Sequence, residues 1–145
     1  MDDKFQQLLD IHEIRQVSIR YNRHADACEG EQFAALFTED GEFDIVGNQT
    51  YRGRKEIASV CYGSVGIVHL AIDSIVEVDG DTATQTSKLI IGKVAADQSS
   101  MDLIGTTTMR DQFVRQGGQW FIKRRQSHID TDPQLALARL AVKAQ

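Results

Sequence analysis

The sequence predicts an α+β fold, in which a strongly curved antiparallel or mixed sheet wraps helices from the N-terminal part of the chain. Apolar residues recur at helical spacing in that part, whereas the second part holds four long stretches with the alternation typical of strands. The tight turns Asp79-Gly80-Asp81 and Gln116-Gly117-Gly118 join two pairs of these stretches as hairpins. Helices followed by hairpin-connected strands are typical of α+β folds.

The N-terminal part begins with two predicted helices. The first runs from about Phe5 to Cys28, and one of its faces is formed, at steps of three or four residues, by Ile11, Ile14, Ser18, Tyr21 and Ala25. Gly30 interrupts this pattern. A short second helix follows, and its apolar side is formed by Phe33, Leu36 and Phe37.

A small hairpin and a third helix come next. Glu39-Asp40-Gly41 is predicted to be a turn that leads into the alternating strand Glu42–Val46. A return strand is predicted at Tyr51-Arg52-Gly53, and a helix from Arg54 to about Tyr62.

The main sheet is predicted from the four alternating stretches, which are Val65–Val78, Thr82–Val94, Met101–Arg115 and Gln119–Ile129. One face of such a sheet covers helices or lines a cavity, and the other meets solvent or another subunit, so we expect a homo-oligomer. Pro133 favours the start of a terminal helix over Gln134–Leu140.

Composition indicates one globular domain over residues 1–145, with 41% hydrophobic and 26% charged residues. The net charge of −5 argues against nucleic acid as a partner, and no apolar run is long enough to cross a membrane. The first residues lack the apolar core of a secretory signal. Cys28 and Cys61 have no metal or redox spacing, so we expect free thiols, a cytoplasmic protein, and neither metal nor cofactor.

His69 is the residue that points to chemistry. It interrupts the apolar run Val65–Ile72, where an ionisable side chain needs a partner or a cavity. Asp26, at the end of the first helix, is a candidate partner. A histidine side chain ordinarily has a pKa of roughly 6.5, and one held by a carboxylate in an apolar cavity is a general base.

The order and spacing of several short motifs resemble the SnoaL-like family of the nuclear transport factor 2-like superfamily, the group of scytalone dehydratase, bile acid 7α-dehydratase and lindane dehydrochlorinase. The resemblance covers nearly the whole chain and is carried by Tyr21-x4-Asp26, Phe33-x2-Leu36-Phe37-x2-Asp40-Gly41-x-Phe43, Tyr51-x-Gly53-x3-Ile57, His69, Val78-Asp79-Gly80-Asp81-x-Ala83 and Gly118-x-Trp120-x-Ile122-x2-Arg125.

The resemblance implies a cone-shaped α+β barrel, with a cystatin-like curved sheet around a deep apolar pocket, and β-elimination without a cofactor. Because both dimers and trimers occur in the family, it also implies a homodimer or homotrimer. By position, His69 matches the family's base and Asp26 its orienting carboxylate. Arg125 and Tyr21 match residues that assist at the leaving group or at a carbonyl. Tyr21 and Asp26 lie about 140° apart on an ideal helix, so both face one pocket only if the helix bends or ends between them.

Other residues are candidates for contact with a hydrophobic small-molecule substrate. They are Phe33, Phe37, Phe43, Met101, Leu103, Met109, Phe113 and His128. For each apolar residue in this set, the alternative interpretation is an ordinary residue of the hydrophobic core. Trp120 is predicted to be a packing anchor. Many chains of the family carry an aromatic residue two positions before the acid of the strand predicted here at Met101–Arg115. Here that position, in Met109-Arg110-Asp111, is occupied by Met109, so the sequence departs from the family pattern. Arg124 and Arg125 are neighbours in a predicted strand, so their side chains point to opposite faces and one of the two points inward.

These observations predict a lyase that removes water or hydrogen halide from a hydrophobic cyclic compound. One alternative is an isomerase in which Asp26 shuttles the proton and His69 donates a hydrogen bond. Another is a non-catalytic binding or assembly domain, for which the charged outer strand face offers Lys88, Lys93, Arg110 and Arg115. A deep pocket with His69 and Asp26 within hydrogen-bond reach favours an enzyme, and a filled cone favours a scaffold.

Overall fold

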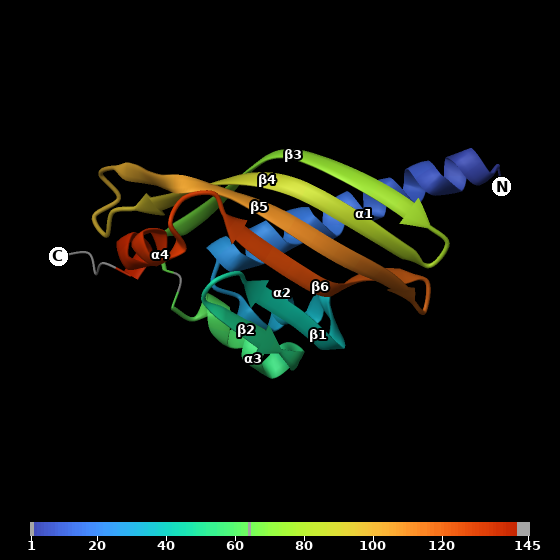
Figure 1. The fold of residues 1–145 in the computed structure, drawn as a ribbon, viewed down its shortest axis with the longest axis horizontal. Helices are drawn as coiled ribbons and strands as arrows, with labels where there is room; N and C mark the ends of the chain where they lie inside the picture. Colours follow the sequence, from blue (N-terminus) through green and yellow to red (C-terminus); the bar gives the residue numbers. More distant parts are fainter. Residues whose placement is uncertain (1, 64, 142–145) are drawn as a thin grey trace.

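The computed structural model describes residues 2–63 and 65–141. The helices are α1 (Asp3–Asp26), α2 (Gly30–Ala35), α3 (Gly53–Cys61) and α4 (Pro133–Ala141), and the strands are β1 (Phe37–Ile45), β2 (Gln49–Arg52), β3 (Ile67–Asp79), β4 (Thr82–Val94), β5 (Met101–Gln116) and β6 (Gln119–Ile129) (Figure 1). Within these residues, no helix combines the length and the hydropathy that crossing a bilayer requires.

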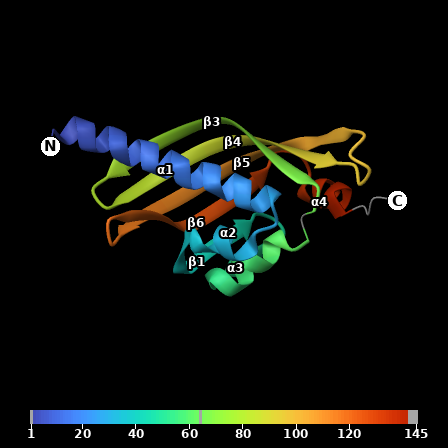
Figure 2. The same ribbon diagram turned by 180° about the vertical axis from the view of Figure 1, so that it is seen from behind.

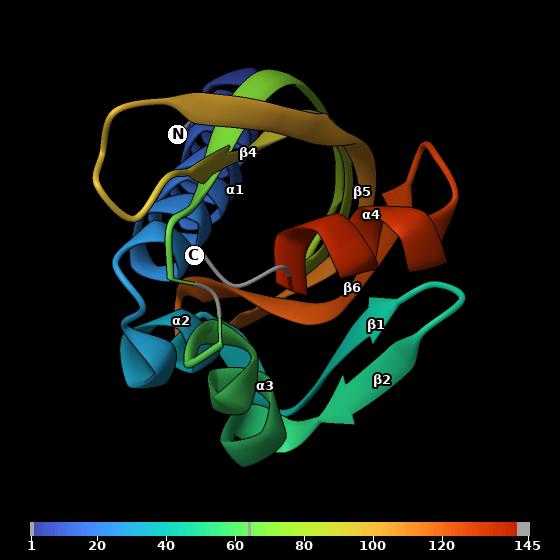
Figure 3. The same ribbon diagram turned by 90° about the vertical axis from the view of Figure 1, so that its left-hand side faces the viewer.

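The strands form one mixed sheet in the order β2-β1-β6-β5-β4-β3. β1 and β6 run parallel, and the other neighbouring strands run antiparallel. The sheet curves strongly, and α1 lies along its concave face (Figure 2). In the view along the strands the curl stays open, so the sheet is not a closed barrel (Figure 3). The predicted α+β fold with a curved sheet is thus confirmed.

Helix α1 is held against the sheet by one buried stripe. Ile14, Val17, Tyr21 and Ala25 repeat at steps of three or four residues, and all are buried. Such spacing places side chains on one face of a helix, and burying that face against the sheet supplies most of the helix's stability. The carboxylate of Asp2 accepts a hydrogen bond from the backbone N–H of Lys4 and caps the helix.

The segment Glu39-Asp40-Gly41 belongs to β1 and is not the predicted turn. β1 already begins at Phe37, which the helical spacing had assigned to the second helix. The pairing of β1 with β6 is irregular between Phe37 and Glu42, so this polar segment forms a bulge within the strand. A Cβ atom at Gly41 would lie 2.9 Å from the Cβ of Phe37, which explains why glycine occupies this close approach.

A buried charged cluster clamps the N-terminal half of α1 to the sheet. Asp10 accepts hydrogen bonds from Arg115 at 2.7 and 3.1 Å and from the indole of Trp120 at 3.2 Å. The guanidinium carbon of Arg115 lies 4.6 Å from the Trp120 ring centroid. Trp120 is 4% exposed, so its prediction as a packing anchor is confirmed. The Arg115 side chain is 22% exposed and paired with Asp10, so it is not a free charge on an outer face.

Asp10→Asn is expected to lower the free energy of unfolding by about 2 kcal/mol, because hydrogen bonds to charged groups contribute about 1.5–3 kcal/mol. Burial alone would raise the pKa of the Asp10 carboxyl, but hydrogen bonds from Arg115, Trp120 and Gln6 outweigh it and hold the pKa below its ordinary value. The clamp therefore stabilises the fold above the unfolded-state pKa, and this contribution is lost as the pH falls through the folded-state pKa.

Urea unfolding of parent and variant, at pH 7 and in acid, measures both effects. Asp81→Asn is the matched control, because the Asp81 side chain binds the same guanidinium at 3.0 Å but is 80% exposed. Its loss should stay below about 0.5 kcal/mol. Equal losses in the two variants, or an Asp10→Asn deficit that does not shrink in acid, would contradict the prediction.

Candidate active site

An apolar cavity of about 260 Å³, here called the His69 cavity, lies at the end of the concave face where α1 ends. Residues of α1, α2, α3 and α4 and of every strand but β2 line it. Figure 3 looks onto this end of the molecule, with α2, α3 and α4 arranged around the mouth of the sheet. The polar side chains on its wall include Tyr21, His69, Thr107 and Ser127.

The structure brings Asp26 and His69 together at the wall of this cavity. Oδ1 of Asp26 lies 2.6 Å from Nδ1 of His69. The backbone N–H of His69 also donates to the carboxylate, at 3.1 Å from Oδ1 and 3.3 Å from Oδ2. In a neutral ring, a carboxylate at Nδ1 favours the tautomer that carries its proton there and leaves a lone pair on Nε2. Nε2 makes no hydrogen bond within the described residues.

The position of Asp26 explains how the pair forms. Asp26 is the last residue of α1, where the helix dipole opposes a negative charge. Departures from such local preferences are expected mainly at functional sites. Asp26 does not itself line the cavity, whereas Tyr21 and His69 do. Tyr21 and Asp26 can therefore belong to one site although they lie on different sides of the helix. Tyr21 lines the cavity itself, whereas Asp26 contacts it only through His69.

Tyr21 is a buried phenol on the cavity wall. It is 2% exposed, and its ring centroid lies 4.4 Å from that of Phe33 and 4.0 Å from the guanidinium carbon of Arg125. Burial raises the pKa of Tyr21 above its ordinary value, and the opposing effect of Arg125 is smaller. The phenol is therefore protonated at neutral pH and can donate a hydrogen bond to a bound molecule.

Arg125 does not line the His69 cavity. Its side chain is 1% exposed, and Nε and Nη2 each donate to one oxygen of Asp111 at 2.7 Å. Burial would lower the pKa of Arg125, but the charge and hydrogen bonds of Asp111 outweigh it and raise the pKa. The guanidinium therefore forms a buried ion pair with Asp111 and contacts the ring of Tyr21. Its neighbour Arg124 faces outward and lies 3.6 Å from Glu42.

Of the residues predicted to contact substrate, Phe33, Phe43 and Met109 line the cavity, whereas Phe37 and Phe113 do not. Phe37 and Phe113 are 0% and 1% exposed and belong to the core cluster. Phe113 lies four residues along β5 from Met109, so it points to the same face but sits deeper under α1. Alternation identifies the inward face of a strand, but it does not identify where along that face a cavity opens.

Met101 and Leu103 are 46% and 59% exposed and lie outside the cavity. The pairing of β4 with β5 skips Ile104, and a bulge of this kind reverses the alternation of the residues beyond it. Ile104, which is 7% exposed, takes the inward position instead. The structure therefore does not place Met101 and Leu103, predicted to contact substrate, at this cavity.

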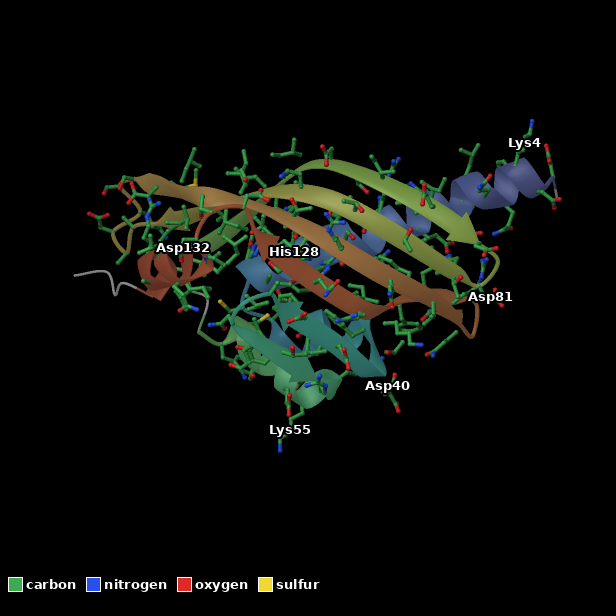
Figure 4. All side chains as sticks on the ribbon, viewed as in Figure 1. Lys4, Asp40, Lys55, Asp81, His128 and Asp132 are labelled. Carbon is green, nitrogen blue, oxygen red and sulfur yellow. The ribbon has the colours of Figure 1, made fainter. Side chains whose placement is uncertain are left out.

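His128 lies on the outer face of the sheet, near the end of β6 (Figure 4). Ser127 and Ile129 line the cavity, and the residue between them points the opposite way. His128 pairs across the strands with Thr108, whose hydroxyl binds Lys88. The structure therefore does not place His128, predicted at the pocket mouth, on the wall of this cavity.

Several wall residues were not predicted. Thr107 and Ser127 are inward residues two positions from Met109 and Arg125, so extending the alternation would have found them. Cys61, on α3, is a further wall residue. Burial, with a smaller effect of Cys28, raises the pKa of the Cys61 thiol to about 12, so it is a neutral part of the wall. Leu137 and Leu140 of α4 also line the cavity. Nothing in the sequence indicates that the terminal helix reaches it.

The side chains described on the wall therefore supply an oriented imidazole, a phenol and two hydroxyls in apolar surroundings. In the ranges 2–63 and 65–141, no three His, Cys, Asp or Glu side chains are grouped so that they could hold a metal ion. A cavity with these properties fits the binding and processing of a small hydrophobic molecule.

Comparisons with known proteins agree with this structure. Residues 6–126 match the model of the SnoaL-like domain family. No curated protein sequence matches the chain. Among solved structures, a nuclear transport factor 2-like protein with a cystatin-like fold from Novosphingobium aromaticivorans is 28% identical, with a TM-score of 0.82 and coverage of 99% of both chains.

Two further structures are similar. An aspartate-to-asparagine variant of a Mycobacterium tuberculosis protein of unknown function is 26% identical, with a TM-score of 0.83, over 99% of this chain and 94% of its own. A candidate scytalone dehydratase from Novosphingobium aromaticivorans is 22% identical, with a TM-score of 0.77, over 88% and 89% of the two chains, and this likeness shows the fold alone. Because the family model matches most of the chain, the protein belongs to the SnoaL-like family and has the nuclear transport factor 2-like fold.

Proposed function

We propose that this protein is a cofactor-independent lyase that removes water or hydrogen halide from a hydrophobic cyclic molecule. One observation carries the proposal: Asp26 holds Nδ1 of His69 at 2.6 Å, while the same imidazole lines an apolar cavity. A general base needs a free lone pair that faces the substrate and a partner that stabilises the cation it becomes.

In the proposed step, Nε2 of His69 takes a proton from a carbon atom of the substrate. The electron pair of that C–H bond becomes the second bond of a C=C group. The neighbouring carbon then releases hydroxide or halide together with the electron pair of the broken bond. The imidazolium returns its proton to the hydroxide, which leaves as water, or to solvent when halide leaves, and the neutral base is restored. The carboxylate of Asp26 stabilises the imidazolium while it exists, and Tyr21, which lines the cavity, donates a hydrogen bond to the departing atom or to a carbonyl.

The alternatives receive less support. An isomerase that uses Asp26 as the proton shuttle needs this carboxylate in contact with the substrate, but Asp26 lies behind His69 and does not line the cavity. A scaffold has no need of a cavity that contains an oriented imidazole. The predicted homodimer or homotrimer stays a prediction. The exposed side chains of Leu70, Ile72 and Ile75 on β3 are available for such contacts.

Elimination from 5-nitrobenzisoxazole tests the proposal without knowledge of the natural substrate. A base takes its carbon-bound proton, the N–O bond breaks, and a coloured phenolate forms. The protein should show saturable turnover about 10²–10⁴-fold faster than free imidazole, the range expected of a positioned general base. Deuterium at the reacting carbon should slow kcat. A rate that stays linear in probe concentration, at the level of free imidazole, would contradict a positioned base.

A further inference from the structure

A second cavity, of about 350 Å³ and here called the Ser87 cavity, lies between α1 and the concave face of β3 and β4. Its wall includes Ser18 of α1 and, on the strands, Ser74, Gln85 and Ser87. Among the described residues that line the two cavities, Met109 of β5 is the one that they share. The proposed function makes no use of this second space.

The strand register shows that the Ser87 cavity continues the His69 cavity along one face of the sheet. On β4, Ile91 lines the first cavity, and Leu89 and Ser87 line the second. On β6, Ser127 lines the first and Arg125 the second. Alternate residues of a strand point to the same face. The two spaces therefore follow one another along the same face under α1, with Met109 in the wall of both, and together they are here called the trough.

The two parts of the trough differ in polarity. The amide of Gln85, a residue 1% exposed, accepts a hydrogen bond from Ser18 Oγ and donates one to Ser74 Oγ, both at 2.5 Å. Ser87 is 7% exposed, and its hydroxyl has no hydrogen-bond partner in the described parts of the chain. Arg15, Asn22 and Asp73 also line the Ser87 cavity, whereas apolar side chains make up most of the wall beside His69. An accessible hydroxyl among polar side chains is suited to an oxygen atom of a ligand, and the His69 cavity is suited to an apolar ring.

We infer that the trough binds one elongated molecule, whose apolar ring system lies beside His69 and whose hydroxyl or carbonyl oxygen lies beside Ser87. Met109 is the specificity-determining residue, because its flexible side chain lets the molecule extend from one part to the other. His69 pairs with Ile91, and Ser87 is four residues further along β4, a distance of about 13 Å at 3.3 Å per residue. That distance sets the separation between the reacting carbon and the oxygen.

Cavity volumes support the same conclusion. Pockets for small molecules usually measure about 300–1,000 Å³. The His69 cavity, at about 260 Å³, falls below this range alone, and the Ser87 cavity adds about 350 Å³. The inference rests on the proposed function for the statement that the ring end is the reacting end. Binding along the trough does not require turnover, so the two can be tested separately.

Three fluorescent probes test the inference by titration calorimetry on the full chain. 2-Naphthol occupies the ring site only, 6-(2-naphthyl)hexan-1-ol adds a tail with a terminal hydroxyl, and 2-hexylnaphthalene adds the tail without oxygen. Met109→Phe, with a rigid and bulkier side chain, should weaken both tailed probes at least about 10-fold relative to 2-naphthol. Met109→Leu, which conserves volume, should change them less than about 3-fold. Ser87→Leu, which fills the second cavity without altering the first, should reproduce the loss.

The oxygen site has its own matched pair of variants. Ser87 and Ser127 are both 7% exposed, and each lines one of the two cavities. Ser87→Ala should weaken the alcohol about 5-fold and leave 2-hexylnaphthalene unchanged, as expected for one lost hydrogen bond. Ser127→Ala should leave the ratio of the two affinities unchanged.

Three results would overturn the inference: tailed probes that do not bind, tailed probes that bind Met109→Phe and Ser87→Leu as they bind the parent, or a Ser87→Ala effect equal for alcohol and alkane. Repeating the titrations on His69→Ala separates this inference from the proposed function. The binding pattern should persist there without turnover. A parent protein that shows the pattern but no elimination would contradict the lyase and leave the trough in place.

Discussion

His69→Ala is expected to lower kcat for elimination by about 10²–10⁴-fold, the contribution of a positioned general base. KM should change little, because the apolar wall of the cavity remains. The side chain is 15% exposed and stands at the edge of a cavity, so its truncation should leave the fold intact. Steady-state kinetics with 5-nitrobenzisoxazole, together with thermal unfolding of the same samples, measure both expectations.

His24→Ala is the matched control for this variant. Nδ1 of His24 lies 3.0 Å from a carboxylate oxygen of Glu29, so it is also a histidine paired with an acid, but it does not line the cavity. Its loss should leave kcat at the parent value. Equal activity in parent and His69→Ala, or equal losses in the two variants, would mean that His69 is not the base.

Asp26→Asn separates the orienting role from the base itself. An asparagine can donate its amide N–H to Nδ1 of His69, and this favours the tautomer whose proton is on Nε2, where the lone pair is needed. A loss of kcat of about 10²-fold or more is expected, while the affinity for 2-naphthol is unchanged. Nitrogen NMR of the imidazole shows which ring nitrogen carries the proton. If Asp26 orients His69, the proton moves from Nδ1 to Nε2 in the variant, and if Asp26 is only structural, the proton stays on Nδ1.

The site pair was predictable because both members depend on local patterns. A strand reveals itself through apolar and β-branched residues, so an imidazole within one is conspicuous. Asp26 stands where the helical spacing of the first segment stops. The resemblance to a family then joined the two residues, which are 43 positions apart in the chain. The four long strands were predicted for the same reason, since their alternation is visible without knowledge of their partners.

Registers and long-range partners were not predictable from the residues alone. The bulge at Ile104 depends on how β4 and β5 pair, and it reverses the faces of Met101 and Leu103. The partner of Arg115 in the clamp, Asp10, lies 105 residues away. Among several acids, the sequence offers no signal that selects it. The Ser87 cavity exists only because α1 and four strands leave space between them, which is a property of packing and not of any one segment.

Asp111→Leu is expected to lower the free energy of unfolding by about 3–5 kcal/mol, the usual loss when one member of a buried ion pair is removed. The side chains of Arg125 and Asp111 are 1% and 0% exposed, and two hydrogen bonds of 2.7 Å join them. A guanidinium does not lose its proton at accessible pH, so the remaining charge stays buried without a counter-ion. Urea unfolding at pH 7 measures the loss, and a loss below about 1 kcal/mol would contradict it.

The double variant Asp111→Leu with Arg125→Met shows what the ion pair is for. Removing both charges together should restore most of the stability, because burying a pair of charges costs about as much as their attraction returns. The same variant loses the cation that lies 4.0 Å from the Tyr21 ring centroid. If the pair serves to position Tyr21, stability returns and kcat does not. If kcat returns with stability, the phenol needs no such support, and Arg125 acts only as part of the core.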